Sequence, residues 1–379
     1  MSTQAVPQST TAVSSPSEDF MPMLGIDHVE LYVGNAAQAA YYFEHAFGFR
    51  RVGYAGLETG LRDRVSHVLE QGRIRLVLTG ALSSETEIAV HHARHGDGVK
   101  TIALSVPDVE HAYREATTRG ADGLTPPEEI SDEHGVVRLA RIATYGETVH
   151  TFVDRSDYAG AFLPGYERVG THTPSAEEML LTIDHIVGNV ELGRMGEWVS
   201  FYEDVFGMVE LVHFSDEAIS TEYSALMSKV VAGGHGRIKF PINEPAEGKR
   251  RSQIDEYLDF YEGPGAQHLA LGSRDIVATV AELRRRGVEF LEIPDAYYEE
   301  VPERVPEVSG MLADLHRQGI LVDHDEDGYL LQIFTKPLGD RPTIFFEIIE
   351  RHGARGFGAG NFKALFEAIE REQERRGNL

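Results

Sequence analysis

Residues 182–190 read Thr-Ile-Asp-His-Ile-Val-Gly-Asn-Val, and residues 25–33 read Gly-Ile-Asp-His-Val-Glu-Leu-Tyr-Val. Both stretches are apolar, strand-like runs with Ile-Asp-His near the start. Each leads into a helix-patterned segment that closes in Phe-Gly, at Gly48 in the first copy and at Gly207 in the second. The chain therefore repeats itself, and an internal repeat constrains the architecture more strongly than any single element does.

Two further pairs of segments extend this repeat. Gly98-Val-Lys-Thr-Ile-Ala-Leu precedes one predicted helix, and Gly265-Ala-Gln-His-Leu-Ala-Leu precedes another. A weaker pair sets Thr148-Val-His-Thr-Phe-Val beside Thr343-Ile-Phe-Phe-Glu-Ile. Each half of the chain thus predicts two units of strand, helix and several strands, the later strands being separated by turns such as Asp327-Gly328.

Four such units in two halves resemble the vicinal oxygen chelate superfamily. The resemblance implies an α+β fold of tandem βαβββ modules, with two half-open barrel domains and a C-terminal helix. The predicted organisation along the chain is a disordered tail over 1–20, an N-terminal barrel without a metal site over 21–155, a Gly- and Pro-containing linker over 156–179, and a catalytic barrel over 180–379 whose capping helix covers 361–376.

The composition limits the chemistry. The chain has no cysteine, so any metal must be held by histidines and carboxylates. The formal net charge of −26 disfavours nucleic acid and anionic membranes as partners. No apolar run approaches the roughly 18 residues that would span a bilayer. We expect the cytoplasm as the default location, a homo-oligomer, and small molecules as partners.

The two halves differ at three matching positions, and this difference predicts a metal site. In the C-terminal half, His185 and His268 lie early on the first strands of their modules, and Glu347 lies in an otherwise apolar late strand, where a charge is costly unless it is paired or metal-bound. In the N-terminal half, the matching positions hold His28, Thr101 and Phe152. A duplicated scaffold that kept its site in one copy explains this pattern, and His28 is interpreted as an ordinary core residue.

Two histidines and one carboxylate suit a particular class of chemistry. Such a facial triad leaves adjacent positions of an octahedral Fe(II) ion open for a bidentate 2-oxo acid and dioxygen. With neutral imidazoles, the site would carry a net charge of about +1, which attracts a carboxylate-bearing substrate. The sequence therefore predicts one Fe(II) per chain, although Zn(II) suits the same ligands.

Several longer strings allow a family to be named. The strings are Phe240-Pro-Ile-Asn-Glu-Pro, Ser252-Gln-Ile, Gly265-Ala-Gln-His-Leu-Ala-Leu, Leu330-Leu-Gln-Ile-Phe-Thr-Lys-Pro-Leu-Gly-Asp-Arg-Pro-Thr-Ile-Phe-Phe-Glu-Ile-Ile and Gly356-Phe-Gly-Ala-Gly-Asn-Phe. They resemble those of the 4-hydroxyphenylpyruvate dioxygenases, and the resemblance implies conversion of 4-hydroxyphenylpyruvate and O2 to homogentisate and CO2 in tyrosine catabolism.

The same resemblance implies a set of site residues. The metal ligands are His185, His268 and Glu347. The residues expected next to the chemistry are Gln267, Gln332 and Phe334. The residues expected to bind substrate are Ser228, Pro241, Asn243, Gln253, Phe345, Phe357 and Phe362. Aromatic walls and a few fixed polar groups are what a flat phenol with a hydroxyl and a carboxylate requires.

Three alternatives stay open on the sequence. One is 4-hydroxymandelate synthase, which shares the substrate and metal but hydroxylates the benzylic carbon. Another is a different metalloenzyme of this scaffold, either an extradiol-cleaving dioxygenase or a glyoxalase-type isomerase. The last is a metal-free protein that sequesters small molecules.

Other motifs are interpreted as structural. The stretch from Asp323 to Gly328 begins like a calcium loop but lacks the closing Glu, so a polar hairpin turn is predicted. The glycines from Gly356 to Gly360 do not complete a dinucleotide fingerprint. His91, His92 and His95 have no acid beside them in sequence and are interpreted as a solvated segment.

Overall fold

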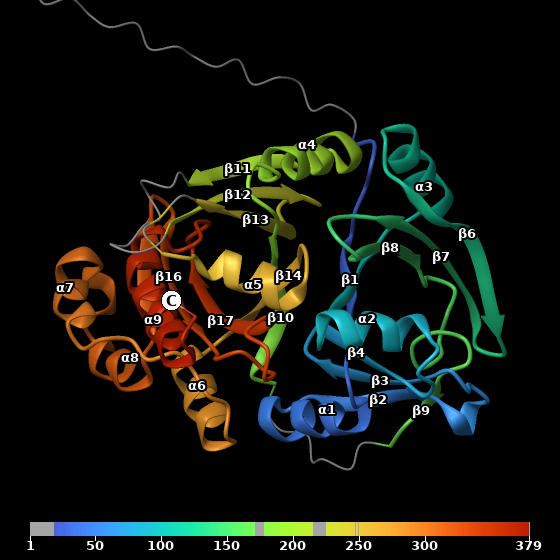
Figure 1. Cartoon of the computed structure of the whole chain (residues 1–379), viewed down its shortest axis with the longest axis horizontal. Coiled ribbons are helices and arrows are strands. Elements are labelled where there is room, and N and C mark those ends of the chain that lie inside the picture. Colours follow the sequence, from blue (N-terminus) through green and yellow to red (C-terminus); the bar gives the residue numbers. More distant parts are fainter. Residues whose placement is uncertain (1–18, 171–177, 215–224, 247, 249, 379) are drawn as a thin grey trace, which may run out of the picture.

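The computed structural model describes residues 19–170, 178–214, 225–246, 248 and 250–378. Within them the chain folds into two curled mixed sheets that lie side by side, each flanked by helices (Figure 1). This is the predicted α+β arrangement of tandem modules, and that prediction is confirmed. No helix among the described residues is long and apolar enough to cross a membrane.

The N-terminal sheet has nine strands and the C-terminal sheet has eight within the described residues. In spatial order, the first consists of β6 (Gly123–Asp132), β7 (Gly135–Ala143), β8 (Val149–Asp154), β5 (Gly98–Ser105), β1 (Gly25–Tyr32), β4 (Ile74–Ala81), β3 (Arg64–Gln71), β2 (Arg50–Ala55) and β9 (Glu167–Arg168). The second consists of β11 (Val209–Phe214), β12 (Ala225–Gly233), β13 (Ile238–Ala246), β10 (Leu180–Asn189), β14 (Gly265–Ser273), β17 (Phe345–His352), β16 (Gly328–Phe334) and β15 (Leu321–Asp325).

The helices flank these sheets and cover their ends. They are α1 (Ala36–Tyr42), α2 (Glu87–His95), α3 (Val109–Thr118), α4 (Met195–Phe206), α5 (Gln253–Tyr261), α6 (Ile276–Arg285), α7 (Tyr297–Arg304), α8 (Leu312–Gln318) and α9 (Phe362–Arg376). The first predicted helix ends in a π-helical turn, Phe43–Phe47, and Gly48 closes it in the left-handed conformation that favours glycine.

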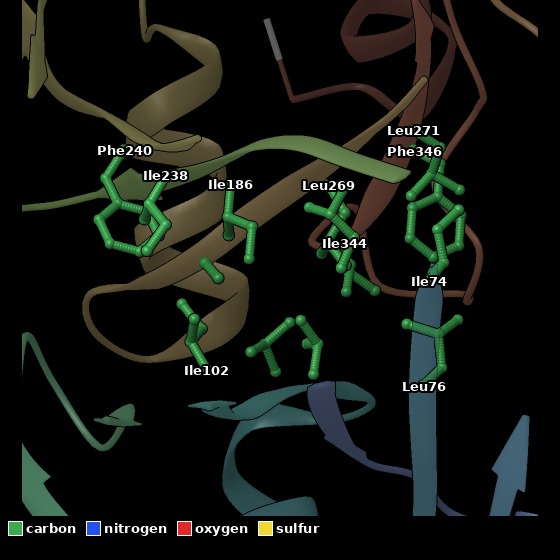
Figure 2. Close-up of a cluster of buried hydrophobic side chains, with 14 of the residues drawn as sticks. Ile74, Leu76, Ile102, Ile186, Ile238, Phe240, Leu269, Leu271, Ile344 and Phe346 are labelled. Carbon is green, nitrogen blue, oxygen red and sulfur yellow. The ribbon is translucent and has the colours of Figure 1, made fainter. Parts of the chain in front are cut away.

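The two sheets pack against each other through a shared apolar core. Figure 2 shows Leu76 of β4 and Ile102 of β5 facing Ile186 of β10 and Leu269 of β14. All four side chains are at most 1% exposed. Burying a side chain of this size stabilises a fold by about 1.5–3 kcal/mol, so this seam holds the two halves as one body.

Strand register shows that the halves are copies of each other. One residue of β14 pairs with both His185 on β10 and Glu347 on β17. The corresponding residue of β5 pairs with both His28 on β1 and Thr151 on β8. The N-terminal counterpart of Glu347 is therefore Thr151.

The predicted counterpart, Phe152, is wrong by one residue. A shift of one position turns a side chain to the opposite face of the sheet. Phe152 accordingly belongs to the fully buried core, where its ring contacts Phe206. The weak sequence pair was misaligned because both strands are buried on both faces, which leaves no clear alternation of apolar and polar residues to fix the register.

The segments flanking the barrels differ in part from expectation. Residues 1–18 of the predicted tail lie outside the described residues, but Phe20 packs on the core and its ring lies 3.4 Å from the Arg119 guanidinium. Within the predicted linker, β9 pairs with β2. The C-terminal helix is confirmed, yet Asn361 makes no side-chain cap for it. The Asn361 side chain instead accepts a hydrogen bond of 2.5 Å from the Tyr297 hydroxyl.

Candidate metal centre and substrate cavity

Three neighbouring strands bring the predicted ligands together. His185 lies on β10, His268 on β14 and Glu347 on β17, and these strands are consecutive in the C-terminal sheet. The Glu347 Oε2 atom lies 3.1 Å from His185 Nε2 and 3.5 Å from His268 Nε2. Residues separated by 83 and 79 positions in sequence therefore present their ligand atoms to one point.

The centre is buried, which sets its electrostatics. His185, His268 and Glu347 are all less than 9% exposed. Burial raises the pKa of Glu347, but the facing His185 and His268 outweigh burial and hold this pKa at about 2. Burial lowers the pKa of His268 below its ordinary value. The carboxylate is thus ionised at neutral pH, and at least one imidazole is neutral, as metal ligands must be.

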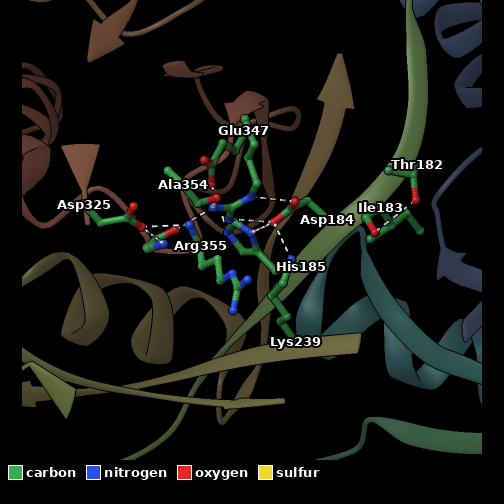
Figure 3. Close-up of polar contacts among 11 residues, drawn as sticks. Thr182, Ile183, Asp184, His185, Lys239, Asp325, Glu347, Ala354 and Arg355 are labelled. Carbon is green, nitrogen blue, oxygen red and sulfur yellow. Dashed lines mark hydrogen bonds and ion pairs between the residues drawn. The ribbon is translucent and has the colours of Figure 1, made fainter. Parts of the chain in front are cut away.

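Residues outside the ligand set orient the imidazoles. The His185 Nδ1 atom lies 2.9 Å from Asp184 Oδ1 (Figure 3). Asp184 in turn receives a two-pronged contact from Arg351, with both N–O distances 2.8 Å. His268 Nδ1 lies 3.0 Å from Gln267 Oε1. These contacts leave both Nε2 atoms directed at Glu347, as second partners of metal-bound histidines do.

Sequence reasoning missed Asp184 and Arg351. The available signal was the repeated Ile-Asp-His string, in which the acid preceding the histidine occurs in both copies. The N-terminal half keeps the whole arrangement, since Asp27 contacts His28 at 2.6 Å and Arg155 at 2.6 and 2.7 Å. What that half lacks is the other two ligands.

The residues present fit a divalent metal ion. Cis ligands of an octahedral ion about 2.1 Å away lie roughly 3 Å apart, close to the 3.1 and 3.5 Å observed here. In addition, Glu347 Oε1 is buried without a hydrogen-bond partner among the described residues. A buried, ionised oxygen without a partner is costly, and a bound cation removes that cost.

The triad opens into a cavity whose empty space, together with the open solvent at its mouth, is about 580 Å³. Predicted residues that line it are Ser228, Pro241, Asn243, Gln253, Gln267, Phe334, Phe345, Phe357 and the three ligands. The cavity is also lined by apolar residues that were not predicted as site residues, namely Val187, Leu226, Val230, Leu365, Phe366 and Ile369. The last three lie on α9, so this helix forms one wall of the cavity.

Local structure explains how several wall residues are positioned. Gln253 begins α5, which Ser252 and Asp255 start with a reciprocal capping box. The Phe345 ring stacks on His268 with centroids 4.7 Å apart, and the Phe357 ring meets His185 edge-on at 5.2 Å. Aromatic rings therefore flank both imidazoles.

Two predicted residues are not placed on this wall. Gln332 is buried but does not line the cavity; its side chain packs under the Gly358 turn, where a Cβ atom would lie 2.4 Å from Gln332 Nε2. Phe362 is the first residue of α9, and its side chain lies outside the described part of the structure.

The interpretation of the segment containing His91, His92 and His95 as solvated is wrong for two of the three. His91 and His95 are each 2% exposed, because one face of α2 packs on the barrel and on Tyr261 of α5. The acid absent from the neighbouring sequence comes from elsewhere, since Glu147 lies beside both rings. The predicted hairpin turn is confirmed, because Asp327-Gly328 connects β15 and β16.

The chain is similar to several known proteins. A family model described as Glyoxalase/Bleomycin resistance protein/Dioxygenase superfamily matches residues 25–144 and 182–333. The chain is 49% identical to 4-hydroxyphenylpyruvate dioxygenase of Dictyostelium discoideum, over 94% of this chain and 100% of that protein. It is 47% identical to 4-hydroxyphenylpyruvate dioxygenase of Yarrowia lipolytica, over 94% and 93%.

Among solved structures, a mutant of 4-hydroxymandelate synthase from Streptomyces coelicolor is similar to this chain, with a TM-score of 0.84 and 35% identity. The match covers 93% of this chain and 100% of that chain.

Proposed function

Because the chain belongs to the 4-hydroxyphenylpyruvate dioxygenase family, we propose that it converts 4-hydroxyphenylpyruvate and O2 to homogentisate and CO2 with one Fe(II) per chain. The observation that carries this proposal is the convergence of His185, His268 and Glu347 at a cavity walled by aromatic rings and amides. The bound iron would supply the redox chemistry by which a 2-oxo acid reacts with O2. The protein's residues position the substrate and exclude water.

The ligand atoms set the orientation of the substrate. Two neutral imidazoles and one carboxylate leave a site of about +1 charge with Fe(II), so the 2-oxo acid end is attracted to the metal. Gln267 uses its carbonyl oxygen on His268, which leaves its amide N–H groups as donors toward the cavity. The phenol end is then directed toward the remaining wall.

The wall supplies the contacts for the ring. Phe334 and Phe345 meet at 6.2 Å in an edge-on arrangement, and both line the cavity. A flat aromatic substrate packs well against such rings. We assign Ser228, Asn243 and Gln253 to hydrogen bonds with the polar groups of the substrate, because these are hydroxyl and amide groups on a mostly apolar wall.

The C-terminal helix has a part in excluding water. Leu365, Phe366 and Ile369 of α9 face the cavity and are each less than 10% exposed. Gly358, in the left-handed conformation, provides the turn that precedes this helix. A reactive oxidant needs a dry site, and an apolar helix over the cavity provides one.

The second candidate is hydroxylation of the benzylic carbon to 4-hydroxymandelate, which the likeness to the Streptomyces structure favours. Metal and 2-oxo acid binding are common to both reactions, so the wall around Pro241, Asn243 and Phe345 must direct the outcome. We favour homogentisate, because this wall resembles that of the dioxygenases and because the Dictyostelium and Yarrowia relatives, similar over nearly their full length, carry that name.

Product analysis decides between these reactions. Purified protein is loaded with Fe(II) without oxygen, supplied with 4-hydroxyphenylpyruvate and then with O2, and the products are separated by chromatography. Homogentisate and CO2 in equal amounts are expected, with neither formed by His268→Ala. Accumulation of 4-hydroxymandelate would overturn the choice, and failure to bind Fe(II) would favour the metal-free sequestering protein.

The same preparation tests the proposed homo-oligomer by light scattering, and cell fractionation tests the proposed cytoplasmic location.

A further inference from the structure

A second group of metal-binding side chains lies outside the triad, in the N-terminal half. His91 and His95 come from successive turns of α2, and Glu147 comes from the turn before β8. Their ligand atoms all lie within 4.8 Å of one another. Glu147 Oε2 is 3.4 Å from His95 Nε2 and 3.9 Å from His91 Nε2.

Three ring nitrogens of this cluster lack hydrogen-bond partners among the described residues. His91 is buried with neither ring nitrogen hydrogen-bonded among the described residues, and the same holds for Nε2 of His95. Leaving a buried polar atom without a hydrogen-bond partner is destabilising. Three such atoms within one cluster indicate that a further group belongs between them.

Neighbouring groups orient the cluster in the way that metal ligands are oriented. The Nδ1–H of His95 donates to the Tyr261 carbonyl, which leaves the lone pair of Nε2 directed at Glu147. Arg94 donates to Glu147 Oε1 at 2.8 Å, which leaves Oε2 for the histidines. The triad is arranged alike, with Asp184 and Gln267 on the Nδ1 atoms of its histidines.

The protonation states suit a cation as well. Burial lowers the pKa of His91 to about 3, so this ring is neutral at pH 7. Burial raises the pKa of Glu147, but the contact with the facing His95 outweighs burial and leaves this pKa below its ordinary value. The Lys100 amine donates to the Glu147 backbone carbonyl and lies 3.5 Å from Glu87.

We propose that His91, His95 and Glu147 form a second metal site, which binds a divalent transition-metal ion of the zinc class. Ligand atoms of a tetrahedral zinc site lie about 3.3 Å apart, close to the separations from the Glu147 carboxylate. Three protein ligands leave one position for water, and the half-exposed Glu147 side chain gives an ion access from solvent.

The position of this site gives it a structural role at the domain seam. His95 stacks on Tyr261 of α5 with ring centroids 4.5 Å apart. The same helix, α5, carries Gln253 of the substrate cavity at its other end. An ion held by α2 therefore fixes the surface on which α5 rests, and its binding stabilises the contact between the two halves.

Metal titration of tag-free protein tests this proposal. Chelator-treated wild-type protein is expected to bind two equivalents of Zn(II), and His268→Ala, which disables the triad, is expected to bind one. Adding Glu147→Gln to that background should remove the remaining equivalent. Because Glu147 is 39% exposed, this substitution is expected to leave the fold intact, which circular dichroism of the metal-free proteins checks.

The chain offers a matched control on the same helix. His92 is 35% exposed and pairs with Asp97 at 2.9 Å, away from the cluster. The double variant His268→Ala/His92→Asn should therefore still bind one equivalent of Zn(II), and Zn(II) should still raise its melting temperature. The proposal is overturned if His268→Ala binds no Zn(II). It is equally overturned if the double variant His268→Ala/Glu147→Gln still binds one equivalent of Zn(II). In that case His91, His95 and Glu147 form an ion pair only.

Discussion

Replacing Asp184 by Asn is expected to weaken Fe(II) binding by about 10- to 100-fold, which is about 1.4–2.7 kcal/mol. Both carboxylate oxygens of Asp184 accept from charged or ring donors: Oδ1 faces His185 Nδ1 at 2.9 Å and Arg351 Nη2 at 2.8 Å, and Oδ2 faces Arg351 Nε at 2.8 Å. An amide must present its NH2 group to one of these donors. Either orientation therefore loses a contact and the charge that holds the imidazole.

The N-terminal copy supplies the control for this experiment. Asp27 contacts His28 and Arg155 through the same pattern of atoms, at 2.6 to 2.7 Å, but no triad forms around His28. Asp27→Asn therefore carries a similar structural cost without the effect on iron. Anaerobic Fe(II) titration of the two variants and of the wild type separates the two contributions.

The expected result is a raised dissociation constant for Asp184→Asn alone, with activity largely recovered at saturating iron. Equal weakening in both variants would show that the loss arises from general destabilisation. Unchanged iron affinity in Asp184→Asn would refute the reasoning that the Asp184–Arg351 pair orients His185.

Three further outcomes follow from the geometry. Glu347→Gln is expected to abolish tight Fe(II) binding and product formation, because the ligand set loses its charge; iron analysis and product assay check this. Phe345→Ala is expected to raise KM for the aromatic substrate and to lower the free energy of unfolding by about 3 kcal/mol, measured by steady-state kinetics and urea titration. His150 is fully buried, and burial lowers its pKa to about 4, so its neutral form contributes stability that is complete above pH 6.5 and falls by about 3 kcal/mol as pH approaches 4. His150→Gln should flatten this part of the stability profile, and an unchanged slope between pH 6.5 and 4.5 would contradict it.

The duplicated halves also account for why only one of them carries the triad. In the N-terminal copy the positions of His268 and Glu347 hold Thr101 and Thr151, and the Phe162 ring packs edge-on against His28 at 4.8 Å. Threonine side chains are short and poor ligands, so the retained histidine has nothing to share a metal with. The acid and arginine that orient it remain as an ordinary buried ion pair.

The sequence by itself determined the repeat and the fold class, and it predicted the three residues His185, His268 and Glu347 that the fold brings together. This was possible because strand periodicity and a charged residue inside an apolar strand are local signals. It also pointed to most of the cavity wall through the strings surrounding Gln267 and Phe345. The distances between these groups were not accessible, since they depend on strand order and register.

Only the tertiary structure decided which residue of β8 corresponds to Glu347 of β17, the orienting role of Arg351 and the environment of α2. Arg351 reaches Asp184 across 167 positions, and Glu147 reaches His95 across 52. A helix face that looks polar in sequence becomes buried when another half of the chain covers it, and no local pattern reveals that contact. Pairings over such separations arise from packing of whole sheets, which is a property of the folded chain and not of any segment in it.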